Sequence, residues 1–207
     1  MLKRLIQVLL IGFAIVGMAA VAGIGLLMRS GISSRDEPGT LETAVARRLR
    51  SIAIPANART LTNPEPANRE TLDDGLTHFA DHCASCHAND GSGQTEMGMG
   101  LYPRAPDMRQ AETQNLTDGQ LFYIIEHGVK LTGMPAWGNG TPEGARASWH
   151  LVYFIRRLPQ LSPADLERMK SLNPRSATEW RQEEEERRFL DGNGAPPAPS
   201  HTHGGTE

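Results

Sequence analysis

The sequence predicts an all-α protein. Its apolar residues recur at helical spacing in several segments, and no segment alternates between apolar and polar residues as a half-buried strand does. Two predicted helix starts carry clear signals: Thr117 has Gln120 three residues later, and Thr141 is followed by Pro142. Beyond an apolar N-terminus, the 207 residues leave room for one small domain with extensions.

The N-terminal segment, residues 1–28, predicts a membrane anchor. The run from Leu5 to Met28 is apolar except for Gln7, and it is long enough to cross a hydrocarbon core as a helix. The alternative is a cleaved signal peptide, because residues 20–22 form an A-x-A site. We favour an uncleaved helix because apolar residues continue past that site. Positive charges flank both ends, so the short N-terminus is what favours export of the remaining chain.

Residues 29–68 are expected to tether this segment to a domain. Four apolar residues recur at helical spacing and predict a short amphipathic helix: Leu41, Val45, Leu49 and Ile52. We interpret this helix as solvated and loosely packed on the domain; the alternative is a helix that lies on the membrane surface. Prolines follow and mark an irregular linker that would let the domain swing.

Residues 69–159 are expected to form the main domain. A first helix is predicted from near Thr71, a second from Thr117 to Gly128, and a third from near Thr141 to just before Pro159. A long loop, rich in glycine and then in proline, separates the first two helices.

The C-terminal part predicts extra helices and a disordered tail. In the extension at residues 160–190, one helix opens at Ser162 and another at Ser176. Residues 191–207 are rich in glycine and proline and are predicted to be disordered. We interpret the histidines of this tail, His201 and His203, as part of a disordered end rather than as a copper or nickel site.

The two cysteines of the chain lie in the motif Cys83-Ala84-Ser85-Cys86-His87. Residues three and four apart share one face of a helix, so both thiols and the imidazole project the same way. Two thiols so placed can form thioethers with the two vinyl groups of one haem, while the adjacent histidine ligates the iron. The motif therefore predicts one covalently attached haem c.

Other uses of this motif fit the sequence less well. A thioredoxin-like C-x-x-C would lie beside a βαβ pattern, and the preceding residues instead read as a helix. A zinc site needs four ligands, and His82, Cys83, Cys86 and His87 form two pairs of neighbours that point in different directions on a helix. Zinc and a disulfide remain the alternatives to haem attachment.

The second axial ligand of the iron is predicted to be Met134. This residue lies in the turn-forming segment at residues 133–137, far enough after His87 for the chain to wrap round a haem. A methionine thioether keeps the iron six-coordinate and raises its potential, which suits electron transfer. The other candidates are Met97, Met99, Met108, Met169, His127 and His150.

Together these segments resemble a class I c-type cytochrome over residues 69–159. The resemblance rests on the C-A-S-C-H motif, the glycine- and proline-rich loop, the G-M-P-A-W segment at residues 133–137, and a few helix positions: Gly75, Phe79, Trp149, Phe154 and Leu158. It implies that the first and last helices of the domain cross closely at Gly75, with Phe79 and Phe154 packed there. Phe154 stands where many relatives carry tyrosine.

The resemblance also implies further haem contacts. A loop proline should accept a hydrogen bond from the ring N–H of His87 through its carbonyl, and residues 102–107 look like that loop. Pro103 is our candidate, although the resemblance does not decide between the prolines of this loop. Arg104 and Trp137 are candidates to bond the haem propionates, the alternatives being a surface arginine and a packing tryptophan.

These features predict a membrane-tethered, monohaem electron carrier rather than an enzyme. Its domain would face the periplasmic side of the cytoplasmic membrane and exchange electrons with redox proteins, themselves membrane-bound. Residues 69–159 carry seven Arg and Lys against eleven Asp and Glu, and the chain has no basic cluster typical of nucleic-acid binding. No small-molecule substrate site is evident. The alternatives are a haem-based sensor or ligand-binding module, and an electron-entry subunit of a larger membrane oxidoreductase.

Overall fold

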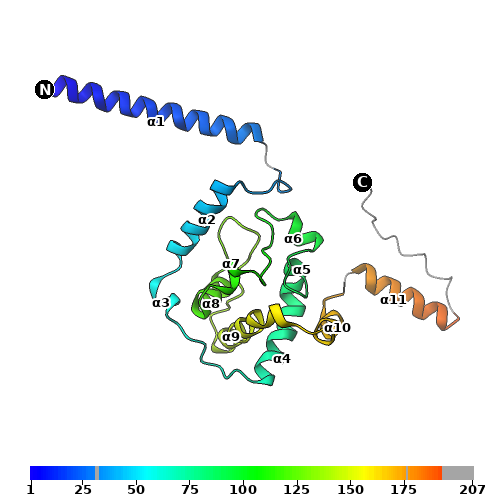
Figure 1. Cartoon of the computed structure of the whole chain (residues 1–207). Helices are drawn as coiled ribbons and strands as arrows, with labels where there is room; N and C mark the ends of the chain where they lie inside the picture. Colours follow the sequence, from blue (N-terminus) through cyan, green and yellow to red (C-terminus); the bar gives the residue numbers. More distant parts are fainter. Residues whose placement is uncertain (31–32, 176, 193–207) are drawn as a thin grey trace.

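The computed structural model describes residues 1–30, 33–175 and 177–192. Within these ranges every regular element is a helix, which confirms the all-α prediction (Figure 1). In chain order the elements are α1 (Leu2–Ser30), α2 (Thr40–Ala53), α3 (Ala56–Arg59), α4 (Arg69–His78), the π-helical turn η1 (Phe79–Cys83), α5 (Ala84–His87), α6 (Glu96–Gly100), α7 (Ala111–Gln114), α8 (Asp118–His127), α9 (Pro142–Arg157), the 3-10 turn η2 (Leu158–Gln160), α10 (Pro163–Leu172) and α11 (Ala177–Leu190).

Helices α4 and α9 cross at the centre of the domain (Figure 1). Gly75 lies at the crossing, where a Cβ atom would come within 2.4 Å of the His150 carbonyl oxygen and 2.9 Å of the Phe154 Cβ. The rings of Phe79 and Phe154 pack beside it with centroids 5.0 Å apart. The close crossing implied by the family resemblance is therefore confirmed, because only a residue without a side chain lets the two backbones approach this far.

One hydrophobic core extends from this crossing. Buried side chains of α4, η1, α8 and α9 form it, and Phe79, Val152 and Phe154 are at most 1% exposed. Trp149 stacks on Phe122 of α8 with ring centroids 4.1 Å apart. This core fixes the positions of the elements that carry the motif cysteines and the loops around them.

Helix α10 belongs to the same core, although the sequence placed it in an extension outside the domain. Met169 is fully buried, and Leu161 and Leu172 pack partly buried against the core. Arg168 also donates to Asp73 of α4 at 2.7 Å. The folded domain therefore continues past residue 159, because the α4–η1 surface needs α10 to cover its apolar side chains.

The second half of the expected linker is also part of the domain. Ile54 and Ala58 are 3% and 5% exposed. The Asn63 side chain donates to the Trp149 carbonyl at 2.9 Å, and the Tyr153 hydroxyl donates to the Glu65 carbonyl at 2.8 Å. The second half of the expected linker over residues 29–68 is thus fixed to α9, through hydrogen bonds between residues far apart in sequence.

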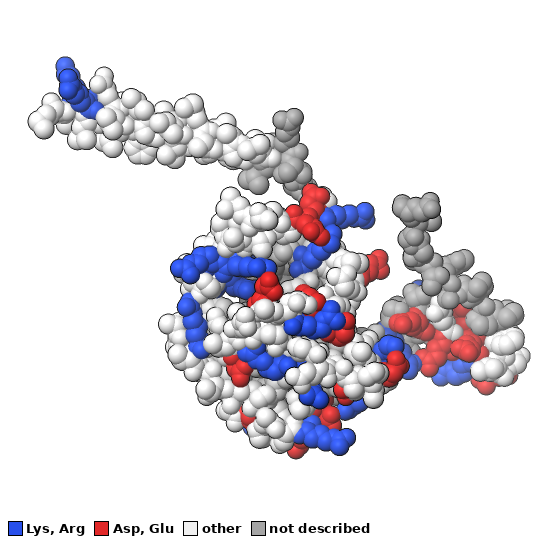
Figure 2. All heavy atoms as spheres, viewed as in Figure 1, with Lys and Arg blue, Asp and Glu red and all other residues white. Residues whose placement is uncertain are grey.

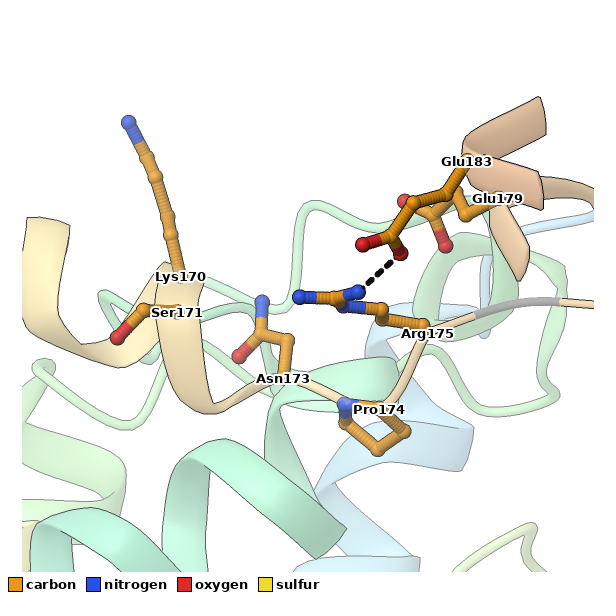
Figure 3. A pocket seen from close by; sticks show the side chains of 7 residues that line it. All are labelled: Lys170, Ser171, Asn173, Pro174, Arg175, Glu179 and Glu183. Atoms are coloured by element: carbon orange, nitrogen blue, oxygen red, sulfur yellow. Dashed lines mark hydrogen bonds and ion pairs between the residues drawn. The ribbon is translucent and has the colours of Figure 1, made fainter. Parts of the chain in front are cut away.

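The two terminal helices lie outside the core (Figure 1). Residues Leu2–Leu26 of α1 are long and apolar enough to cross a membrane, and they project away from the domain. Arg175, which follows the end of α10, forms an ion pair with Glu183 of α11 (Figure 3). The same guanidinium lies over the ring of Trp180. The predicted cap at Ser176 and the histidines of the tail lie outside the described residues.

Candidate haem site

The motif helix is built from three consecutive pieces, α4, η1 and α5. Asn68 caps α4 by accepting a hydrogen bond from the Thr71 amide at 2.9 Å, so the helix starts slightly earlier than the sequence predicted. The backbone then widens into a π-helical turn at Phe79–Cys83 and returns to α-helix over Ala84–His87. Such turns are frequent at functional sites, and this one ends on the first motif cysteine.

Both motif cysteines are free thiols and partly buried. Burial, with a smaller contribution from neighbouring Cys86, raises the pKa of the Cys83 thiol to about 12. Among the described residues no group of three or more His, Cys, Asp or Glu is arranged to hold a metal ion.

His87 ends α5 with its ring largely enclosed. Its Nδ1 atom is buried and makes no hydrogen bond of regular geometry within the described part of the chain. Burial lowers the pKa of His87, and an interaction with the backbone carbonyl of Pro106 opposes this by raising it. The carbonyl that faces the ring is thus that of Pro106, whereas the sequence candidate was Pro103, in the same loop.

The loop after His87 folds back onto the motif. The Gly93 amide donates to the His87 carbonyl at 2.8 Å, and the Thr95 hydroxyl donates to the Ser85 carbonyl at 2.8 Å. Gly98 packs so tightly that a Cβ atom there would lie 2.1 Å from the Cys86 carbonyl oxygen. No local pattern in the sequence indicates that Thr95 and Gly98 serve the motif, because glycines are common throughout this loop.

Arg109 bridges two carboxylates, Asp90 and Asp107, at the far end of this loop. The Arg109 guanidinium donates to Asp107 Oδ1 and Asp90 Oδ2, each at 2.8 Å. The hydrogen bond from the Arg109 side chain to Asp107 lowers the pKa of Asp107 to about 2, and weaker hydrogen bonds from Gln110 and the Arg109 amide add to the effect. The arrangement joins the segment just after His87 to the segment just after Pro106, and so it keeps the Pro106 carbonyl near the ring.

Met134 lies half-buried in a tight turn between α8 and α9. Its amide donates to the Thr132 hydroxyl at 3.1 Å, and its carbonyl accepts from the Val129 amide at 3.1 Å. Gly133 packs against Leu101, where a Cβ atom on the glycine would lie only 2.5 Å from a Leu101 methyl group. The turn carrying Met134 therefore meets the loop that carries the Pro106 carbonyl.

The other candidates for the second axial ligand lie in the hydrophobic core, on the exposed surface or beside polar groups. Met108 and Met169 are buried in the hydrophobic core, while Met97 and Met99 are 57% and 41% exposed on α6. His150 lies between two carboxylates, with ring nitrogens 3.6 Å from Glu65 and 3.4 Å from Asp74. His127 stacks on Tyr123 and contacts its carbonyl.

The two candidate propionate ligands occupy different environments. Arg104 donates to Glu37 at 2.9 Å and to the Arg35 carbonyl at 3.3 Å, so the segment before α2 engages it. Trp137 is 36% exposed and packs edge-on against His82, which directly precedes the first motif cysteine. Trp137 therefore lies close to the motif.

A haem fits these residues. Two thiols three residues apart, an imidazole whose Nδ1 is buried with no regular hydrogen bond from the described chain, and a carbonyl facing that imidazole form the donor set expected for attachment through thioethers and histidine. Together with the helical fold, they define a c-type cytochrome domain.

Comparison with known proteins points the same way. Residues 70–155 match the family model described as "Cytochrome C oxidase, cbb3-type, subunit III". No curated protein matches the chain. The matched region thus indicates a cytochrome c domain, which implies a haem c cofactor and a role in electron transfer.

Proposed function

We propose that this protein is a membrane-tethered carrier of single electrons with one covalently attached haem. The observation that carries the proposal is the His87 ring, buried at the end of the same helical stretch that presents Cys83 and Cys86. When bound, the haem supplies one-electron chemistry by cycling its iron between the ferric and ferrous states.

In this proposal the residues of the motif hold the haem from one side. Cys83 and Cys86 would attach it through thioethers, and His87 would ligate the iron through Nε2. The Pro106 carbonyl would then accept the Nδ1–H of His87, fixing the tautomer and the orientation of the ring. The hydrogen bonds from Arg109 to Asp90 and Asp107 would support this contact, because they hold the loop on which Pro106 lies.

Met134 would complete the coordination from the other side. As a thioether donor, Met134 would favour the ferrous state of the bound haem. The short turn between Thr132 and Pro135 would position the sulfur, because the hydrogen bonds to Thr132 and Val129 leave its backbone little freedom. Trp137 would cover the haem edge beside His82 and exclude water there.

The N-terminal helix α1 would anchor the chain in the cytoplasmic membrane, with the cytochrome domain on the periplasmic side. No part of its apolar span is buried within the protein, so the helix has no packing role inside the fold. Anchoring raises the local concentration of the domain near membrane-bound donors and acceptors. The described anchor contains no acidic residue, as a membrane span requires.

A second candidate function is that of an electron-entry subunit in a larger respiratory complex. The family description names a subunit of a cytochrome c oxidase, which favours a stable partner over free diffusion. Helix α11, which lies outside the core, would be available to such a partner. Mild detergent extraction followed by gel filtration tests it: a haem peak that elutes with other subunits supports the complex, and a lone chain supports the carrier.

The proposal is tested by optical spectra of the full-length holoprotein, oxidised and reduced, with and without carbon monoxide. We expect a low-spin, six-coordinate c-type spectrum that carbon monoxide does not change. In Met134→Ala the spectrum should become high-spin and respond to carbon monoxide at once, whereas the control Met99→Ala should resemble the wild type. A wild-type protein that binds carbon monoxide readily would instead indicate a sensor or ligand-binding module.

A further inference from the structure

Helix α2 presents an apolar stripe away from the domain, defined here as Leu41, Val45, Leu49 and Ile52. These side chains are 77%, 48%, 61% and 63% exposed, and no residue of α2, which is described in full, is buried. At 100° per residue the four positions fall within one narrow face of the helix. A stripe of this kind is costly in water and indicates a surface that something covers.

The opposite face of α2 rests on the domain. The residues of α2 that are partly buried, Thr43, Arg50 and Ser51, lie away from the stripe around the helix. Arg47 pairs with Glu112 at 3.6 Å, and Glu42 accepts a hydrogen bond from the Tyr102 hydroxyl at 2.6 Å. The helix is therefore held in place from the domain side, and its orientation makes the stripe face outward.

The position of α2 in the chain points to what covers the stripe. Residues 31–39 alone separate it from the end of α1, a stretch that spans at most about 30 Å when fully extended. In Figure 1, α2 lies on the side of the domain from which α1 departs. Any membrane that α1 crosses is thus within reach of the stripe.

The charges around the stripe suit a lipid headgroup layer. Arg48 flanks the apolar face, and Arg47 and Arg50 lie further round the helix. Figure 2 shows basic side chains on the flank of the domain formed by α2 and α3. Two of the nearby acidic groups have partners within the protein, since Glu37 pairs with Arg104 and Glu42 accepts a hydrogen bond from the Tyr102 hydroxyl. Apolar side chains bordered by arginine are typical of helices that lie in the membrane interface.

We propose that α2 lies in the membrane interface, with its apolar stripe inserted among the lipids, and so sets the orientation of the cytochrome domain. This inference rests on the proposed anchoring by α1. Because Tyr102 and Arg104 join the segment at residues 35–42 to the loop carrying Pro106, the haem loop is held on the membrane-facing side of the domain. The domain then presents a fixed side to membrane-bound redox partners instead of swinging freely.

The test is site-specific photocrosslinking of the full-length holoprotein in nanodiscs of phosphatidylethanolamine and phosphatidylglycerol. A photoreactive phenylalanine analogue replaces Leu49 in the stripe, Thr43 on the opposite face, or Ile11 within α1. We expect lipid adducts at positions 49 and 11 and no lipid adduct at position 43. An adduct at position 11 without one at position 49 overturns the inference while leaving the anchor intact.

Two other outcomes are equally decisive. A crosslinked dimer at position 49 shows that a second copy of the chain covers the stripe, and it overturns membrane insertion. If the intact mass shows that the mature protein lacks α1, the anchor is refuted. The crosslinking is then repeated on that shorter holoprotein with added vesicles. Lipid adducts at position 49 would still support an interfacial helix, and their absence would refute the interfacial helix as well.

A matched pair of variants gives an independent measurement. The three arginines of α2 are trypsin sites, and insertion of the stripe should protect them in nanodiscs. Leu49→Glu should abolish this protection, while Leu190→Glu, at an exposed leucine of α11, should leave it unchanged. Equal protection in both variants would contradict the proposal.

Discussion

The substitution Gly75→Ala probes the crossing on which the whole domain is built. The new methyl group would lie 2.4 Å from the His150 carbonyl oxygen and 2.9 Å from the Phe154 Cβ. Favourable contacts between heavy atoms need at least about 3.5 Å, so α4 and α9 must separate by roughly 1 Å. The atoms that obstruct the methyl group lie on the backbone or next to it, so no side-chain rotation relieves the clash.

The magnitude follows from two opposing effects. Overpacking a rigid core costs up to about 3 kcal/mol, and replacing glycine by alanine within a helix returns about 1 kcal/mol. The expected net loss is therefore about 2 kcal/mol. For a domain of this size that loss lowers the Tm by roughly 8 °C.

The assay is thermal unfolding of the holoprotein, followed by circular dichroism in the haem absorption band. Gly100→Ala is the matched control, because Gly100 ends α6 and a Cβ atom there would meet nothing within 4 Å. We expect the control to unfold near the wild-type temperature. If Gly75→Ala proved as stable as Gly100→Ala, the close crossing of α4 and α9 would be refuted.

Three further predictions concern the extension, the loop and the tether. Met169→Ala should destabilise the domain by about 2–5 kcal/mol in chemical denaturation, because the side chain is fully buried; an unchanged midpoint would place α10 outside the folding unit. The pKa of Asp107 is lowered to about 2, so the ionised side chain contributes its full stability above the ordinary aspartate pKa of about 4 and loses this contribution as the pH falls towards 2. In Asp107→Asn the free energy of unfolding should therefore change less with pH in that range. Arg104→Gln and Glu37→Gln each break the same ion pair, so both should make the segment before α2 equally more sensitive to proteases and leave the redox potential unchanged. A shift in redox potential in Arg104→Gln alone would instead indicate that Arg104 contacts a haem propionate.

Much of the site could be predicted from local sequence. The spacing of Cys83, Cys86 and His87 follows from helix geometry alone, and the structure places all of them on one helical stretch. The capping box at Thr117 and Gln120 forms as predicted, because its hydrogen bonds join residues three apart.

The features that could not be predicted depend on contacts between distant residues. Nothing local distinguishes Pro106 from Pro103 as the carbonyl facing His87; the choice depends on how Asp90 and Arg109, nineteen residues apart, close the loop. The burial of Met169 likewise depends on a surface formed by α4 and η1, far earlier in the chain.

The sequence by itself determined the helical class, the C-x-x-C-H motif, the apolar N-terminal helix and the amphipathic pattern of α2, because each depends on residues within a few turns of one another. Only the tertiary structure decided which segments outside residues 69–159 contact the domain, and which face of α2 points outward. Those outcomes depend on packing and hydrogen bonds between segments such as Asn63 and Trp149, whose separation along the chain leaves no periodic trace.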